Sequence, residues 1–73
     1  MFTMSAREIK RALRRNAREG VWPSSLAQIA ARRGNSRTVM TMALKQPRRY
    51  RDARLFIEQA LRGDVVAPAS KAS

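Results

Sequence analysis

Four side chains that can donate hydrogen bonds recur at helical spacing near the middle of the chain. Arg37, Thr41 and Lys45 stand four residues apart, and Thr38 follows Arg37 directly. Residues three or four positions apart lie on one side of an α-helix. A guanidinium can donate two hydrogen bonds to O6 and N7 of guanine, and a threonine can bond a base edge or contact a thymine methyl group. The pattern therefore suits contact with the base edges of a nucleic acid.

The same segment has an apolar side, so a helix here has an inward and an outward face. Val39, Met40, Ala43 and Leu44 fall opposite the polar residues. This periodicity is typical of a helix packed on a core. The outward face contains no acid that would repel phosphate. The alternative interpretation is an ordinary solvated face of a helical bundle.

Caps and helix breakers predict the elements that position this face. Ser5 with Glu8, and Ser25 with Gln28, match the capping box that begins a helix. Gly20, Gly34 and Gly63 stand where a left-handed residue can end a helix, and Pro47 disfavours helix at the residue before it. We expect helices over residues 6–19, 26–33, 37–45 and 49–62. The predicted fold is a compact all-α four-helix domain over residues 1–63, followed by a disordered Ala/Ser-rich tail over 64–73.

Each predicted helix has an apolar face that we expect to form the core, with Trp22 covering one end of it. The inward residues of the helices other than the third are Ile9, Ala12, Leu13, Ala17, Leu26, Ile29, Ala30, Tyr50, Ala53, Phe56, Ile57, Ala60 and Leu61. Asp52 and Glu58 are expected to be solvated partners of basic residues.

Composition points to a polyanionic partner. The chain has 73 residues, a net charge of +11, no cysteine and no histidine. Disulfides, the usual zinc ligand sets and catalytic triads are excluded, and the five acids form no convincing catalytic pair. We expect no enzyme activity, cofactor, metal, membrane span or small-molecule substrate. The expected location is the bacterial cytoplasm, with association to the nucleoid when bound.

The basic residues are unevenly matched by acids. Residues 21–46 contain four basic residues and no acid, whereas residues 1–20 and 47–62 each contain two acids. An element that approaches the phosphate backbone is expected to have this composition.

The segment 25–46 also has the spacing of a helix-turn-helix. This motif needs a small residue where its helices cross and a tight turn that usually contains glycine. Ala30 and Gly34 meet these needs, and Ala43 falls where the second helix packs back on the first.

The stretch SLAQIAARRG, with the later pattern P-x(5)-A-x(2)-F-I-x(2)-A-L-x-G from Pro47 to Gly63, resembles the phage Cro/repressor superfamily of lambda repressor-like domains. Within it, the chain looks most like the small Ner-like regulators of transposable phages. The resemblance covers residues 24–63. Arg33 and Asn35 stand where that family usually has apolar residues.

The resemblance implies a sequence-specific regulator that binds double-stranded DNA, of the phage or prophage repressor type, with its second motif helix in the major groove. It implies an inverted-repeat operator bound by a homodimer or by two monomers, and steric block of polymerase. The residues expected to face DNA bases are Ser36, Arg37, Thr38, Thr41, Met42 and Lys45.

A second set of residues suits phosphate contacts. Free backbone donors point outward at the start of the helix over 26–33, and arginines flank the turn and follow Pro47. The members are Ser24, Ser25, Gln28, Arg32, Arg33, Arg48, Arg49 and Arg51. The alternative is that these charges only keep a small domain soluble.

Two other functions remain open. The first helix, with REIKRALRRNAR, is arginine-rich and amphipathic, as are helices that bind structured RNA. The exposed aromatic run that stacks unpaired bases is missing, because the few aromatic residues are scattered. The same fold also serves protein-interaction modules such as antitoxins, which would bind a protein partner strongly and DNA weakly.

Overall fold

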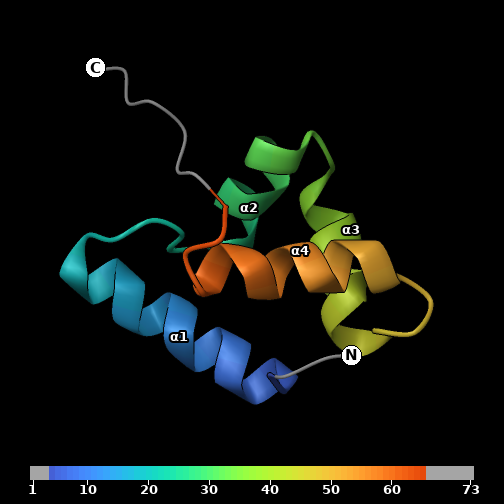
Figure 1. Cartoon of the computed structure of the whole chain (residues 1–73), viewed down its shortest axis with the longest axis horizontal. Helices are drawn as coiled ribbons and strands as arrows, with labels where there is room; N and C mark the ends of the chain where they lie inside the picture. The colour runs from blue at the N-terminus through green and yellow to red at the C-terminus, as the bar shows by residue number, and fades with distance from the viewer. Residues whose placement is uncertain (1–3, 66–73) are drawn as a thin grey trace.

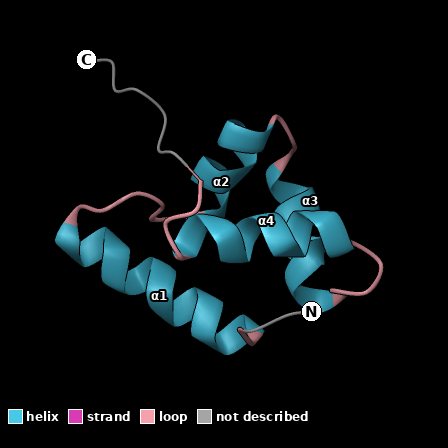
Figure 2. Ribbon diagram, in the orientation of Figure 1, coloured by secondary structure: helices cyan, strands magenta, loops and turns pink. Residues whose placement is uncertain are grey.

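Four α-helices form the protein in a computed structural model that describes residues 4–65. They are α1 (Ala6–Glu19), α2 (Leu26–Arg33), α3 (Arg37–Lys45) and α4 (Arg51–Leu61). Figure 2 shows helices joined by loops and turns, with no strand among the described residues. The all-α four-helix prediction is confirmed.

Helix α4 is central to the packing. It contacts α1 on one side and both α2 and α3 on the other, and α2 packs against α3 (Figure 1). The fully buried side chains Ile9, Ile29, Met40 and Ile57 come one from each helix. Trp22 packs against this core, as expected for the only tryptophan.

Local capping explains the bounds of the first three helices. Ser5 and Glu8 form the predicted capping box, with Ser5 N donating to Glu8 Oε1 at 2.8 Å and Glu8 N to Ser5 Oγ at 3.2 Å. At α2 the box is altered, because Ser25 Oγ accepts from Gln28 N but the Gln28 amide oxygen accepts from Ser24 N. The bounds of α2 and α3 agree with the prediction.

Helix α4 begins two residues later than predicted. Residues 47–50 form a turn in which Gln46 O accepts from both Arg49 N and Tyr50 N, at 3.2 and 3.1 Å. Tyr50 has a non-helical backbone (φ −114°, ψ 50°) because the chain must change direction after α3 before α4 can return across the core. It is half-buried at the start of the helix rather than inside it.

Two expectations about burial are wrong. Ala17 is exposed. Each step of four residues rotates about 40° around a helix, so the two steps from Ile9 through Leu13 to Ala17 move Ala17 off the buried face. The C-terminal end of α1 also extends beyond α4 (Figure 1). Glu58, expected in solvent, is 1% exposed and lies beside the buried Arg54.

The end of the domain extends slightly past Gly63. Asp64 N donates to Gln59 O at 2.9 Å, and Val65 packs against the core. The rest of the predicted tail, residues 66–73, lies outside the described residues.

Candidate nucleic-acid interface

Helices α2 and α3 are joined by a tight turn at Gly34. Gly34 is left-handed (φ 86°), and the amides of Gly34 and Asn35 both donate to Ala30 O, at 2.8 and 2.9 Å. Ser36 then caps α3, with its Oγ accepting from Val39 N at 3.3 Å. Because these bonds satisfy both helix ends locally, only three residues separate the end of α2 from the start of α3.

The predicted base-contacting residues all lie on α3 or at its N-cap. Ser36, Arg37, Thr38 and Lys45 are exposed, whereas Thr41 and Met42 are half-buried. The inward face of α3 is formed by Met40, Ala43 and Leu44, with Val39 half-buried.

The two threonines of α3 differ in what their hydroxyls can do. Thr41 Oγ1 donates to Arg37 O at 3.1 Å, so its proton already has an acceptor within the helix. The Thr38 hydroxyl has no hydrogen bond to another described residue, and the side chain is exposed. Thr38 is therefore the threonine of α3 with a free hydroxyl donor.

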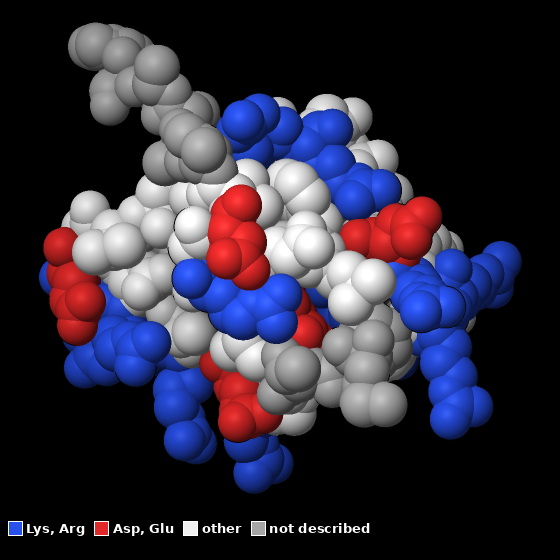
Figure 3. Space-filling view, in the orientation of Figure 1, with Lys and Arg blue, Asp and Glu red and all other residues white. Residues whose placement is uncertain are grey.

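Basic side chains lie on more than one side of the molecule. In Figure 3 they project from the lower left, over α1, and from the right, over the connection between α3 and α4. A third group lies at the top, near the turn between α2 and α3. The cations near α3 therefore form only part of the basic surface.

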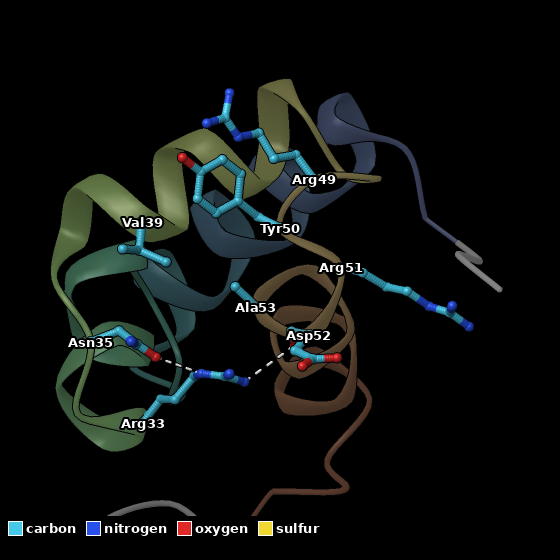
Figure 4. A pocket seen from close by; sticks show the side chains of 8 residues that line it. All are labelled: Arg33, Asn35, Val39, Arg49, Tyr50, Arg51, Asp52 and Ala53. Atoms are coloured by element: carbon cyan, nitrogen blue, oxygen red, sulfur yellow. Dashed lines mark hydrogen bonds between the residues drawn. The ribbon is translucent and has the colours of Figure 1, made fainter.

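A shallow pocket of about 250 Å³ lies where the α2–α3 turn, α3 and the start of α4 meet (Figure 4). Val39, Tyr50 and Ala53 supply its apolar residues, and Arg49 and Arg51 border it with their side chains pointing outward. The Arg49 guanidinium lies 5.9 Å from the centroid of the Tyr50 ring. With Arg33 and the acid Asp52, which also line it, the pocket brings three arginines and one carboxylate together beside the N-terminal half of α3.

Arg33 occupies the side of this pocket and is already bonded. Its Nε donates to Asn35 Oδ1, and its Nη1 donates to Asp52 O at 3.2 Å (Figure 4). Its guanidinium also lies 5.5 Å from the centroid of the Phe56 ring. Arg33 therefore links Asn35 of the α2–α3 turn to Asp52 of α4 by hydrogen bonds.

The phosphate candidates do not form one cluster. Arg33, Arg49 and Arg51 share the pocket beside α3, whereas Ser24 and Gln28 line a separate hollow of about 280 Å³ with Gly20, Val21 and Trp22. The remaining candidates are Ser25, whose hydroxyl caps α2, and Arg32 and Arg48, which are exposed and line neither hollow.

The buried pair Arg54 and Glu58, which was not predicted from the sequence, stabilises the C-terminal end of α3. Arg54 Nη1 donates to Ala43 O and Leu44 O at 3.1 and 3.3 Å, and Arg54 Nη2 donates to Met4 O at 2.7 Å. Arg54 Nε lies 3.6 Å from Glu58 Oε2, which also accepts from Met4 N at 3.4 Å. The i,i+4 spacing of Arg54 and Glu58 beside Ile57 is the one feature of the sequence that pointed to them.

Residues 4–65 contain five acids and neither histidine nor cysteine. No group of three His, Cys, Asp or Glu side chains in this range could hold a metal ion. None of the four helices is both long and apolar enough to cross a membrane.

Comparison of the chain with family models, curated proteins and solved structures finds no match.

Proposed function

We propose that this protein binds duplex DNA sequence-specifically through α3 and regulates transcription. In this proposal α2, the Gly34 turn and α3 act as a helix-turn-helix, with α3 in the major groove. The observation that carries it is the outward face of α3, where the side chains of Arg37, Thr38 and Lys45 are exposed and make no hydrogen bond or ion pair to another described residue. The whole stretch 21–46 contains no acid.

The side chains on this face have complementary roles in base contact. Arg37 can donate a bidentate pair to guanine, and Thr38 can donate to a base acceptor. Lys45 adds charge in the last turn, and the exposed part of Met42 can contact a thymine methyl group. A helix with donors and an apolar contact can distinguish base pairs in the major groove.

The exposed arginines that follow α3 support the same placement of DNA. Arg49 and Arg51 come within six residues of Lys45, which ends α3 on its outward face, so phosphates flanking the groove can meet them while α3 faces the bases. Phosphate contacts set the register of a protein on DNA, and base contacts then supply specificity.

One helix of nine residues contacts few base pairs. We therefore propose that two copies occupy an inverted repeat, as a dimer or as two monomers on DNA. Repression of the phage or prophage type, by steric block of polymerase, is the regulatory mode that the resemblance to the Cro/repressor superfamily favours.

Selection of bound fragments from a random duplex library, with a structured RNA pool in parallel, tests this function. An enriched palindrome is the expected result, and the Arg37→Ala variant is expected to enrich a more degenerate one. Enriched RNA hairpins would instead favour RNA binding through α1. Enrichment of neither, with a protein partner captured at high affinity, would favour the antitoxin-like module.

A further inference from the structure

Helix α1 has a basic face that the proposed function does not use. This basic stripe consists of Arg7, Lys10, Arg11, Arg14, Arg15 and Arg18, all exposed. At 100° per residue the six positions fall within an arc of about 140°, opposite the buried Ile9 and Leu13, and their Cα atoms span about 17 Å along the axis.

The basic stripe has no internal charge compensation. Within residues 4–65 none of the six cations makes an ion pair or a side-chain hydrogen bond. Of the two acids of α1, Glu8 accepts a hydrogen bond from Ser5 N, and neither Glu8 nor Glu19 forms an ion pair with the stripe. Like charges four residues apart, such as Arg7 with Arg11 and Arg14 with Arg18, destabilise a helix. A polyanion bound along the stripe would remove this repulsion.

The basic stripe faces away from α3. Helix α1 packs on α4 through Ile9 and Leu13, and α3 packs on a different side of α4 (Figure 1). The basic side chains over α1 and those over the α3–α4 connection accordingly project from different edges of the molecule (Figure 3). A straight duplex seated on α3 would leave the stripe uncovered.

We propose that the basic stripe binds the phosphate backbone of a second DNA duplex, so that one copy of the protein joins two duplex segments. The contact at α3 rests on the proposed function, whereas the contact at α1 rests on the stripe itself. A duplex fits because the stripe is straight and contains only Lys and Arg, with no aromatic side chain to stack on unpaired bases. Contacts of this kind attach to phosphates independently of sequence.

A two-duplex capture assay tests the bridge. One duplex with the selected site is fixed to beads, protein is added, and a fluorescent duplex without that site is supplied in solution. The full chain is expected to retain the fluorescent duplex. A variant with Arg7→Gln, Arg11→Gln, Arg14→Gln and Arg18→Gln is expected to bind the beads but to retain at least about tenfold less fluorescent duplex. Glutamine is nearly as good a helix former as arginine, and circular dichroism checks that α1 persists.

The matched control replaces the same four arginines by lysine, which keeps the charge. This variant is expected to retain the second duplex nearly as well as the unaltered chain. Capture that survives the glutamine changes would overturn the proposal, because two copies joined through another surface would then account for it. Retention of a labelled RNA hairpin in preference to the duplex would overturn it as well.

The outcomes separate this proposal from the proposed function. If the unaltered chain binds the beads with the expected site preference but retains no second duplex, the bridge alone fails. If Arg37→Ala leaves that preference unchanged while the glutamine variant still loses the second duplex, the role of α3 fails and the contact at α1 stands.

Discussion

The guanidinium of Arg54 donates a hydrogen bond to the carbonyl oxygen of Ala43 at 3.1 Å, and this bond joins α4 to the last turn of α3. The last carbonyls of a helix have no partner within it, so a buried helix end needs an external donor. Arg54 supplies one to Leu44 as well and is itself accompanied by Glu58. The position of α3 therefore depends on a charged pair that lies within the core.

Arg54→Met is expected to lower the free energy of unfolding by about 3–5 kcal/mol, since it removes the buried cation beside Glu58 and the donor that the carbonyls of Ala43, Leu44 and Met4 share. Urea unfolding followed by circular dichroism measures this loss. The double variant Arg54→Met with Glu58→Leu is expected to recover part of it, because no unpaired charge then remains in the core.

The control for this prediction is Arg51→Met, an exposed arginine on the same helix. Its effect is expected to stay within about 0.5 kcal/mol. An equal loss in Arg51→Met and Arg54→Met would contradict a specific role for the buried pair.

Gly34→Ala is expected to destabilise the protein by about 1–2 kcal/mol through backbone conformation alone. Gly34 has φ +86°, and a Cβ added there would meet no atom within 4 Å, so no clash contributes. Thermal unfolding measures the change. Gly34→Asn should lose less stability than Gly34→Ala, because asparagine adopts the left-handed region more readily than alanine. Equal losses for the two variants would argue against this explanation.

The bounds of α2 and α3 were predictable because neighbouring residues determine them. Ser25 and Ser36 cap the two helices, and Gly34 ends the first, all within a few positions of the bounds themselves. The first residue of α4 was not predictable, because it depends on how the chain turns at Tyr50 to bring α4 back across the core. The residues near Tyr50 do not by themselves determine the direction of this turn.

The candidate site was predictable to a similar extent. Periodicity alone placed Arg37, Thr38 and Lys45 on an exposed face. It did not reveal the pocket beside α3, because Arg33, Val39 and Arg49 come from three segments that meet only in the folded chain. The burial of Arg54 was not predictable either, because Met4 and the C-terminal end of α3, which both accept its hydrogen bonds, come together only in the folded chain.

Arg37→Ala is expected to cost about 1–3 kcal/mol of binding free energy on the selected site and to relax its base preference. Arg48→Ala should weaken binding to all duplexes alike, because Arg48 is exposed beyond α3 and suits a phosphate contact. Titration of selected and scrambled duplexes at one salt concentration compares the two variants. Equal losses on both duplexes for Arg37→Ala would exclude a role in base contact.

Thr38→Val and Thr41→Val are expected to differ, although each replaces the same hydroxyl by a methyl group in the same helix. Thr41 Oγ1 already donates to Arg37 O, whereas the exposed Thr38 hydroxyl has no partner among the described residues. Thr38→Val should therefore cost about 0.5–1.5 kcal/mol of binding free energy on the selected site, the value of one hydrogen bond. Thr41→Val should cost less, because the Thr41 hydroxyl already donates its proton to Arg37 O and has none to give to a base. Since both variants carry the same change in helix propensity, titration with the selected duplex isolates the hydroxyl, and a larger loss for Thr41→Val would contradict the proposed division between the two threonines.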